Sequence, residues 1–496
     1  MTCILAIDQG TTGSTCLVVA HDGRVLGRGY REITQHYPAP GWVEHDPGEI
    51  LERTFDAARE AMAQAAAADP RAIPVAVGIT NQRETVVLWE RATGRAVHPA
   101  IVWQDRRTAD RCAALAPQAE LIAARTGLVT DPYFSATKLE WLLALPGVRA
   151  RAEAEELAAG TIDSWLIWHL TGGVVHATDH TNASRTMLYD LDARGWSHEL
   201  CALFGVPQAL LPKVAPSGGH FGVTVPSAIG LSIPIMGVMG DQQAALYGQG
   251  GWSAGGGKNT YGTGAFLLLN TGAQRPATGH GLLTTIACDE RGSPVYALEA
   301  SIFIAGAAVQ WLRDGLGIID SASETQAMAR SLASNDGVYF VPALTGLGAP
   351  DWEPGARGTI VGMTRGTTRA HFARAALEAM AYATYDVLDD MRRAGDVPFD
   401  RLRVDGGATN NDWLMQFQAD VLGVPVERPD VVETTALGAA GLAGLTAGVW
   451  RNGAEFLASR QFTRFTPGKG RDDAVEGHRG WRRAVRAALG WARDLA

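Results

Sequence analysis

The N-terminal residues describe a strand, a tight glycine turn and a returning strand. Two aliphatic runs, residues 3–7 and 16–20, flank the segment Asp8-Gln9-Gly10-Thr11-Thr12-Gly13-Ser14-Thr15. Glycine lets a backbone approach an anion closely, and successive turn N–H groups with Thr and Ser hydroxyls can surround phosphate oxygens. The Asp8 carboxylate, at the end of the first run, could hold a magnesium ion through water. A plain hairpin turn would also explain these residues.

Charge and composition restrict the class of protein. The 496 residues carry a formal net charge of −9, which disfavours nucleic acid or an anionic membrane as the main partner. No stretch of 18 apolar residues and no leader-like N-terminus occurs, so we predict no membrane insertion and no export. Five scattered cysteines without a CxxC pair favour reduced core thiols in a cytoplasmic protein.

Helical and strand-like segments alternate along the chain, which predicts an α/β fold. Helical spacing covers residues 48–68, 108–124 and 137–145, and apolar strand-like runs cover residues 75–79, 100–103 and 233–239. Residues 434–449, rich in Ala and Gly, are interpreted as a tightly packed core helix. The stretch 460–496, with alternating basic and apolar residues, is interpreted as a solvated helix, with a docking surface as the alternative.

The glycine-rich stretch at residues 248–257 predicts a boundary between two domains, 1–247 and 248–496. Beyond it the opening pattern recurs, because the turn 259–264 precedes the apolar run 265–269. A third glycine turn, 406–408, follows the strand-like run 402–405 and precedes an amphipathic segment, 410–422. Two related domains facing one cleft, with a nucleoside triphosphate held from both sides, are therefore expected.

Polar clusters at the ends of apolar runs are the candidate functional residues. The chain has no GxxxxGK[ST], HRD, DFG or HExxH element, and no GxGxxG in its first turn. Arg83 and Glu84 could fix two neighbouring hydroxyl groups, or form a surface ion pair. Asp241 could accept a proton from an alcohol, or cap a helix. Trp103, Tyr133 and Phe266 lie near the same ends, where each could equally be a core residue.

The chain resembles the FGGY carbohydrate kinases, a family of the actin, hexokinase and Hsp70 superfamily. The resemblance extends over nearly the whole sequence and rests on residues 8–12, 41–47, 81–85, 103–107, 131–135, 240–243, 261–264 and 404–408. It implies two ribonuclease H-like domains with a central cleft. The Arg83-Glu84 pair and the segments 131–135 and 240–243 point to the members that phosphorylate glycerol with ATP.

The resemblance also implies roles for individual residues. Asp241 would be the general base, and domain closure around ATP-Mg²⁺ and the polyol would precede phosphoryl transfer. The polyol would be bound by Arg83, Glu84, Trp103, Tyr133, Asp241, Gln242 and Phe266. The nucleotide would be bound by Thr11, Thr12, Ser14, Thr263, Gly306, Gln310, Gly407, Ala408, Asn411 and Asp412. Asp8 would help to place Mg²⁺.

Three departures from the family pattern restrict what the resemblance implies. Gly13 and Thr15 replace a serine and an arginine of the phosphate turn, which removes a positive charge. Ser232 replaces the arginine that helps regulated members to bind fructose 1,6-bisphosphate, so poor binding of that effector is expected. Asp412 follows Asn411 where some members have two asparagines. A homodimer or homotetramer is expected from the family.

Two other functions stay open at this point. A kinase for another polyol or for a ketose would use the same fold and the same residues. A catalytically weak, nucleotide-dependent regulatory protein is the alternative that the missing arginine favours.

Overall fold

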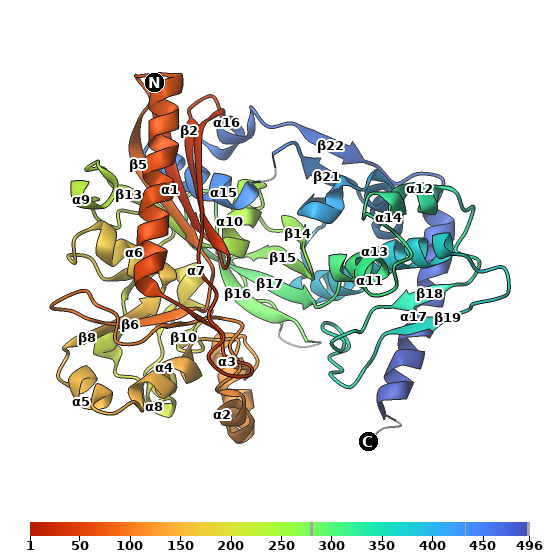
Figure 1. Ribbon diagram of the computed structural model, residues 1–496, viewed down its shortest axis with the longest axis horizontal. Coiled ribbons are helices and arrows are strands. Elements are labelled where there is room, and N and C mark those ends of the chain that lie inside the picture. The colour runs from red at the N-terminus through yellow and green to blue at the C-terminus, as the bar shows by residue number, and fades with distance from the viewer. Residues whose placement is uncertain (278–280, 432, 494–496) are drawn as a thin grey trace. The chain divides into compact units, whose positions relative to one another are not determined.

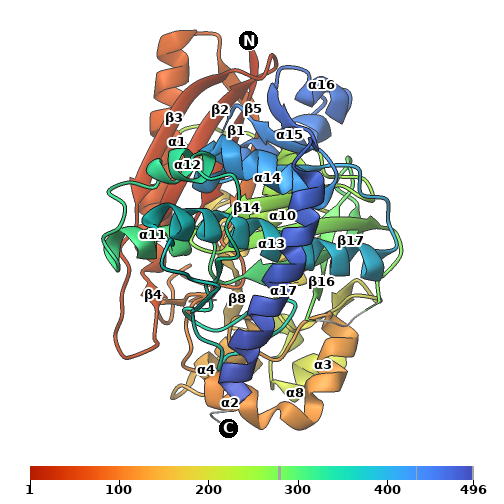
Figure 2. The same ribbon diagram turned by 90° about the vertical axis from the view of Figure 1, so that its right-hand side faces the viewer.

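The computed structural model describes residues 1–277, 281–431 and 433–493 (Figure 1 and Figure 2). The chain forms two compact units, each built from separate segments. Unit 1 comprises residues 1–253, 284–297 and 433–460, and unit 2 comprises residues 254–283, 298–432 and 461–496. The segment 433–460 lies in the second half of the sequence but belongs to unit 1, so the boundary at 247 and 248 stays a prediction about sequence domains.

A five-stranded sheet is the centre of unit 1, with the strand order β13-β5-β1-β2-β3. The first three strands in sequence are antiparallel, whereas β5 and β13 run parallel to β1. Residues 3–7 of β1 are all fully buried, because helices cover both faces of the sheet. The strands are β1 (Thr2–Gln9), β2 (Gly13–Ala20), β3 (Val25–Glu32), β5 (Ile73–Asn81) and β13 (Ile235–Gly240).

Helices α1 (Pro47–Ala68) and α15 (Thr434–Thr446) cover the two faces of this sheet. Asp46 caps α1, since its side chain accepts from the N–H groups of Gly48 and Glu49, and Pro47 takes the first helical position. On the other face, a Cβ at Gly78 of β5 would lie 2.2 Å from the carbonyl oxygen of Ala439. The predicted tightly packed core helix at 434–449 is thus confirmed.

The central strands of unit 2 repeat the order found in unit 1. The hairpin of β15 (Ala265–Gly272) and β14 (Gly257–Tyr261) is followed across the sheet by β20 (Leu402–Asp405) and β21 (Val426–Pro429), both parallel to β14. β22 (Phe462–Phe465) pairs antiparallel with β21. β16 (Leu283–Cys288) and β17 (Pro294–Ile302) each have residues in both units. The α/β prediction and the internal repetition are therefore confirmed.

The C-terminal helix α17 (Arg471–Arg493) is not a solvated helix, so this prediction is wrong for one of its faces. Trp481, Val485 and Ala488 recur at helical spacing and are buried in the core of unit 2. The Trp481 indole stacks on Tyr382 with a centroid separation of 5.9 Å and donates to Asp386 Oδ2 over 2.9 Å. Residues 494–496 of the predicted stretch lie outside the described residues.

The helix expected at 108–124 is interrupted, because Pro117 cannot donate the backbone hydrogen bond of a helix interior.

The remaining strands of unit 1 are β4 (Glu44–His45), β6 (Val86–Glu90), β7 (Ala100–Ile101), β8 (Leu157–Thr161), β9 (Ala177–Asp179), β10 (Tyr189–Asp190), β11 (Gly195–Trp196) and β12 (Lys213–Ala215). Its other helices are α2 (Ala109–Ala114), α3 (Ala119–Thr126), α4 (Ala136–Leu143), α5 (Val148–Glu153), α6 (Ile162–Leu170), α7 (His180–Ala183), α8 (His198–Leu203), α9 (Pro226–Ile229), α10 (Asp241–Gly248) and α16 (Gly453–Leu457). Unit 2 adds α11 (Gly306–Asp314), α12 (Glu324–Arg330), α13 (Arg369–Gly395), α14 (Asp412–Leu422), β18 (Tyr339–Val341) and β19 (Thr359–Val361).

Candidate functional site

Three parallel strands of unit 1 end side by side, and the candidate residues follow their ends. In the sheet register Gln9 of β1 and Gly240 of β13 both pair with Asn81 of β5. The glycine turn therefore begins at the same edge of the sheet as residues 82–85 and Asp241. Ligand sites of α/β proteins gather at this edge, which explains how residues far apart in the sequence meet.

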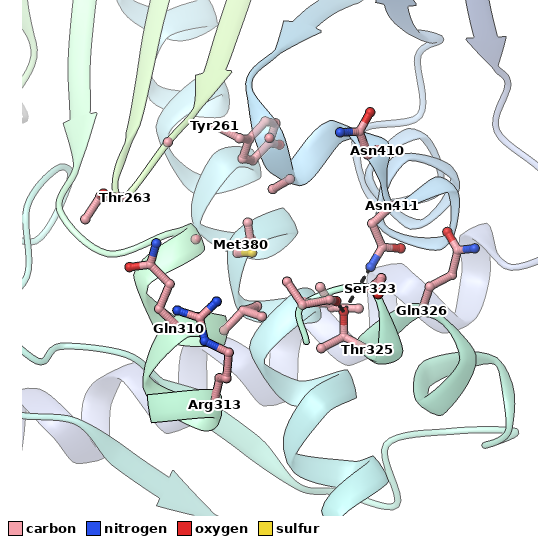
Figure 3. A pocket seen from close by; sticks show the side chains of 17 residues that line it. Tyr261, Thr263, Gln310, Arg313, Ser323, Thr325, Gln326, Met380, Asn410 and Asn411 are labelled. Carbon is pink, nitrogen blue, oxygen red and sulfur yellow. Dashed lines mark hydrogen bonds between the residues drawn. The ribbon is translucent and has the colours of Figure 1, made fainter. Parts of the chain in front are cut away.

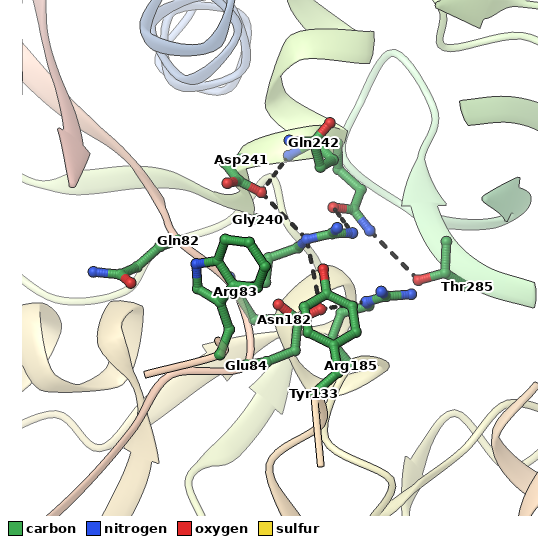
Figure 4. A network of polar contacts seen from close by, with 12 residues as sticks. Gln82, Arg83, Glu84, Tyr133, Asn182, Arg185, Gly240, Asp241, Gln242 and Thr285 are labelled. Carbon is green, nitrogen blue, oxygen red and sulfur yellow. Dashed lines mark hydrogen bonds and ion pairs between the residues drawn. The ribbon is translucent and has the colours of Figure 1, made fainter. Parts of the chain in front are cut away.

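A buried charge cluster lies at this edge (Figure 4). The Arg83 guanidinium places Nε 3.2 Å from Asp241 Oδ1 and 3.8 Å from Glu84 Oε1, and both Arg83 and Glu84 are almost fully buried. Its Nη1 donates to Gln243 Oε1 over 3.2 Å. Glu84 has a left-handed backbone with φ of 63°, which is uncommon for a residue with a side chain and is typical of functional sites. Arg83 and Glu84 are thus a buried pair and not a surface ion pair.

Arg185 is a member of this cluster that the sequence analysis missed. It is fully buried, and its Nε donates to Glu84 Oε1 over 2.6 Å. The guanidinium carbon also lies 5.6 Å from the ring centroid of Tyr133 and 5.1 Å from that of Phe134. Arg185 therefore fixes Glu84 and packs against the rings of Tyr133 and Phe134. Figure 4 shows Arg185 beside Glu84 and Tyr133.

The short helix α7 precedes Arg185 and ties the strand ends together. The Thr181 hydroxyl accepts a 2.9 Å hydrogen bond from the N–H of Gly240, the residue before Asp241. The side-chain amides of Asn182 and Asn81 donate to each other over 3.1 Å and 3.0 Å. One feature of the sequence points to Arg185: it ends the polar run 179–185, which follows the apolar helix α6. In the structure every residue of this run except His180 is buried.

Two aromatic side chains form one wall of the site. The rings of Trp103 and Tyr133 meet edge to face with centroids 5.5 Å apart. The Trp103 indole N–H donates to Thr11 Oγ1 over 2.9 Å, so this wall is joined to the glycine turn. The Lys138 ammonium, which is fully buried, donates to the Tyr133 carbonyl over 2.8 Å. Burial lowers the pKa of Lys138 to about 7.

The glycine turn exposes some of its hydroxyls and buries another. Thr11 is half-buried and Thr12 is exposed, as the side chains of an anion-binding turn should be. Ser14 is fully buried, and its hydroxyl is hydrogen-bonded to that of Thr54 on α1 over 2.7 Å. Its side chain therefore faces the helix because residues alternate between the faces of a strand, and the expected contact of this hydroxyl with phosphate does not fit its position.

Asp8 and Asp241 are two carboxyl groups that influence each other. Burial raises the pKa of Asp8 to about 7, and the nearby Asp241 carboxylate adds to this effect. Asp241 begins α10 and is partly exposed, and one of its oxygens accepts from the Gln242 N–H over 2.7 Å. Gln242 is half-buried beside it (Figure 4). Phe266, the remaining candidate, lies at the start of β15 in unit 2.

Unit 2 contains a cavity of about 590 Å³ (Figure 3). Of the expected nucleotide-binding residues, the cavity is lined by Thr263, Gly306, Gln310, Gly407, Ala408 and Asn411. Arg313, Thr325, Gln326 and Asn410 also line it and were missed by the sequence analysis. They lie on or beside α11, α12 and the turn after β20, so only the tertiary structure collects them.

The pair Asn411-Asp412 has divided roles. Asn411 caps α14 by accepting from the Leu414 N–H over 3.0 Å, and it donates to Thr325 in the cavity wall over 3.2 Å. Asp412 does not line the cavity, because its carboxylate accepts from Arg428 over 2.9 Å. The sequence left open which of the two residues meets a nucleotide, and the geometry favours Asn411.

The glycine turn of unit 2 is fastened to the start of α11. The Thr263 carbonyl accepts from the N–H groups of Ala305 and Ala307, over 2.8 Å and 3.0 Å, and the Thr263 side chain is exposed. Gly406 has a φ of 91°, and a Cβ there would lie 2.2 Å from the Tyr261 carbonyl oxygen. Only glycine fits at this position, because the turn after β20, which contains Gly406, passes so close to β14.

Within residues 1–277, 281–431 and 433–493, no helix is both long and apolar enough to cross a membrane. The same part of the chain has no group of three or more Asp, Glu, His or Cys side chains placed to hold a metal ion.

Comparisons with known proteins agree with this geometry. Family models of the N-terminal and C-terminal domains of the FGGY family of carbohydrate kinases match residues 3–248 and 257–447. A glycerol kinase of Aromatoleum aromaticum is 56% identical over 99% of both chains. The structure of Plasmodium falciparum glycerol kinase with ADP has a TM-score of 0.94 and 35% identity, covering 99% of this chain and 98% of that one.

A xylulose kinase structure from Rhodospirillum rubrum supports the fold alone, with a TM-score of 0.88, 24% identity and coverage of 99% and 100% of the two chains. The expected pair of ribonuclease H-like, actin-like ATPase domains is therefore confirmed, whereas the cleft between them stays a prediction. The repeated strand order, the residues at the strand ends and the match over both halves together show that the chain belongs to the FGGY family of carbohydrate kinases.

Proposed function

We propose that the protein transfers the γ-phosphoryl group of ATP to glycerol, giving ADP and sn-glycerol 3-phosphate. The observation that carries this proposal is the charge cluster of buried Arg83 and Glu84 with the partly exposed Asp241, beside a glycine turn. The chain is also 56% identical over 99% of its length to a glycerol kinase. Cytoplasmic location and assembly into a homodimer or homotetramer stay predictions.

The polyol site that we propose uses charge for the hydroxyl groups and aromatic rings for the carbon chain. The Arg83 guanidinium has donors and the Glu84 carboxylate has acceptors, so together they can bind adjacent hydroxyls. Tyr133 and Gln242 add polar contacts, and Trp103 and Phe266 cover the apolar side of the polyol. Because Arg83 and Glu84 are already held by partners, these side chains would lose little conformational entropy when the polyol binds.

Asp241 is the general base of the proposed reaction. Its partly exposed carboxylate accepts the proton of the terminal hydroxyl as that oxygen attacks the γ-phosphorus. The new O–P bond forms while the bond between the γ-phosphorus and the β,γ-bridging oxygen breaks, and ADP leaves. Arg83 Nε, 3.2 Å from Asp241 Oδ1, orients the carboxylate.

The proposed nucleotide contacts differ in their chemistry, so we assign the adenosine part and the phosphate groups to different sets of residues. We assign the adenosine part to the cavity of unit 2, with Gly306, Gln310, Gly407, Ala408 and Asn411 in its wall. Phosphate oxygens are assigned to the turns, to Thr11 and Thr12 in unit 1 and to Thr263 in unit 2. Ser14 can contribute only its backbone, and Asp412 acts through Arg428.

Mg²⁺ fits the carboxyl groups present. Asp8 and Asp241 are close enough for the Asp241 charge to raise the pKa of Asp8, and a divalent cation would remove this repulsion. One carboxylate is enough, because Mg²⁺ usually keeps several waters and takes phosphate oxygens. Asp8 would hold the ion, which would supply charge neutralisation for the transferred phosphoryl group.

The test is ADP release by the purified protein with ATP and Mg²⁺. The acceptor would be glycerol, a series of other polyols and ketoses, or none. We expect release that depends on glycerol, with kcat/KM falling for chains of four and five carbons. Preference for a longer acceptor would overturn the assignment to glycerol, and no acceptor-dependent release would overturn the kinase proposal in favour of a regulatory protein.

A further inference from the structure

One motif of the resemblance, residues 41–47, has no role in the proposed reaction. Within it His45 lies on β4, directly before α1, and is fully buried. Its Nε2 bonds to Gln35 Oε1 over 2.8 Å, and its Nδ1 faces Gln82 Nε2 at 3.4 Å. One imidazole therefore lies between two glutamine side chains.

Both glutamines continue from His45 to the glycine turn of unit 1. Gln35 Nε2 donates to the Thr11 carbonyl over 2.8 Å. Gln82 Nε2 donates to Gly10 O over 3.3 Å and to Gln9 Oε1 over 3.0 Å. Two successive carbonyls of the turn thus accept from the amides of Gln35 and Gln82, which both contact the same ring. The Gly10 carbonyl also accepts from Gln9 Nε2 over 2.8 Å, and Gln9 is itself bonded to Gln82.

The partners fix the protonation of the ring. The Gln35 oxygen can only accept, so His45 Nε2 carries a hydrogen, and Nδ1 is then the acceptor for the Gln82 amide. Burial lowers the pKa of His45 to about 4, which keeps the ring neutral at neutral pH. A neutral imidazole satisfies both glutamines, whereas an imidazolium would present a second donor to the Gln82 amide.

The direction of these carbonyls decides how the turn faces an anion. In a trans peptide the C=O of one residue and the N–H of the next point in opposite directions. Carbonyls of Gly10 and Thr11 that are held from the inside turn the N–H groups of Thr11 and Thr12 the other way. Successive N–H groups presented in this manner form a concavity for an anion.

We propose that His45 is a positioning residue that, through Gln35 and Gln82, sets the peptide groups of the turn at Gly10–Thr12 for the phosphate groups of the nucleotide. This inference rests on the proposed function, since it assigns a cause to the phosphate affinity of the same site. The two hydrogen-bond partners of His45 described above, Gln35 and Gln82, are assigned neither to the polyol nor to the adenosine part.

Two substitutions each keep one half of the arrangement. In His45→Asn the side-chain oxygen replaces Nδ1 and keeps the contact with Gln82, whereas the contact with Gln35 is lost. In His45→Gln the amide nitrogen replaces Nε2 and keeps the contact with Gln35. We expect binding of a non-hydrolysable ATP analogue with Mg²⁺ to weaken by about threefold to tenfold. His45→Asn should have the larger effect, because it removes the 2.8 Å contact and not the 3.4 Å one.

Adenosine is the matched ligand, and His176 is the matched residue. Adenosine has no phosphate, so its affinity, measured by the same calorimetric titration, should not change in either variant. His176 is another histidine of unit 1 whose pKa burial lowers to about 4, and its Nε2 bonds to the Ala159 carbonyl over 2.9 Å. His176→Asn should leave both affinities at the wild-type value.

Gln35→Leu provides a second, less buried test, because Gln35 is half-buried. This substitution removes the donor to Thr11 O. Adding His45→Asn to it should then cause no further loss of affinity for the ATP analogue. Additive losses in the double variant, or wild-type affinity for the analogue in folded single variants, would overturn the role of His45. If the wild-type protein itself fails to phosphorylate glycerol, the proposed function fails instead.

Discussion

At the scale of single residues, Asp241 combines accessibility with a fixed orientation. Arg83 holds one of its oxygens at 3.2 Å, and the side chain is 30% exposed. Asp241→Asn keeps the shape of the side chain and removes its basicity. A positioned base contributes about a hundredfold to ten-thousandfold to such reactions, so kcat should fall by at least about a hundredfold while the affinity for ATP changes little.

Steady-state phosphorylation and calorimetric binding of ATP check this prediction together. Asp192→Asn is the control, because this carboxylate lies after β10 and outside the site. Wild-type turnover in Asp241→Asn would remove Asp241 from the base role. Equal losses of turnover and ATP binding would instead assign it mainly to nucleotide binding.

Asp8 carries a pH dependence whose sign follows from its raised pKa. The folded protein holds this proton up to a pKa of about 7, whereas an ordinary Asp loses it near 3.8. The folded state therefore binds more protons than the unfolded state between these values, and Asp8 costs stability as pH rises through this window. Asp8→Asn removes that cost, so we expect a melting temperature a few degrees higher than wild type at pH 8, with little difference at pH 4.

Thermal unfolding of the ligand-free protein at the two pH values gives the measurement. The comparison is made between variants at each pH, so other titrating groups such as Asp163, whose pKa burial also raises to about 7, cancel. An equal shift at both pH values would show that packing, and not charge, causes the effect. Since the Asp241 charge contributes to the raised pKa, Asp241→Asn should make the gain from Asp8→Asn smaller.

At the scale of elements, the segment around α7 positions the residues that follow the strand ends, because it contacts Gly240 and Glu84. Asp179 caps α7 by accepting from the N–H groups of Thr181 and Asn182, which brings Arg185 to Glu84 one turn later. Arg185→Lys keeps the charge but loses the planar donor and the contact with Tyr133 and Phe134. We expect KM for glycerol to rise about tenfold, with a smaller change in KM for ATP.

Arg125→Lys is the matched control, because Arg125 pairs with Glu199 on the surface of unit 1 with 47% of its side chain exposed. That variant should have wild-type kinetics, since exposed pairs contribute little. Parallel rises in both KM values of Arg185→Lys would indicate a general loss of structure. An unchanged KM for glycerol would show that Glu84 keeps its orientation without Arg185.

The sequence predicts elements well where one periodic pattern decides them. Residues 48–68 have such a pattern, and α1 lies where it predicts. Residues 434–449 have no such pattern, but their Ala- and Gly-rich composition predicts a tightly packed helix, and α15 lies there. The sequence did not show that the Ser14 hydroxyl bonds to Thr54 on α1, because a glycine turn does not reveal which hydroxyl faces the helix behind it. Arg185 and Arg313 were missed, because their roles depend on contacts more than 100 residues apart and on helices that no local pattern joins.

The C-terminal helix shows the same restriction. Its basic residues predict solvent on one face, and the sequence does not show that the core of unit 2 lies on the other. The pairing of residues 41–47 with residues 103–107 is a further example. Arg107, buried with Asp105 and Glu44, joins two motifs that are separate in the sequence.

At the scale of the whole molecule, unit 1 is completed by a segment from the far end of the chain. Helix α15 packs on β1, β5 and β13, and Leu437, Leu442 and Leu445 are at most 3% exposed. Burying a leucine stabilises a fold by about 1.5–3 kcal/mol, so these three side chains alone approach the 5–15 kcal/mol that is typical of the net stability of a domain, as an order of magnitude.

A fragment of residues 1–253 should therefore not fold stably, although it contains every strand of the unit 1 sheet. Without α15 it exposes the sheet face at Gly78, and we expect aggregation or no cooperative melting by circular dichroism. The matched control joins residues 433–460 to the same fragment through a flexible Gly/Ser linker, which restores the missing helix. Cooperative melting of the control but not of the shorter fragment would show that α15 is part of unit 1. Equal stability of the two would mean that the sequence boundary, and not the discontinuous unit, marks the folding unit.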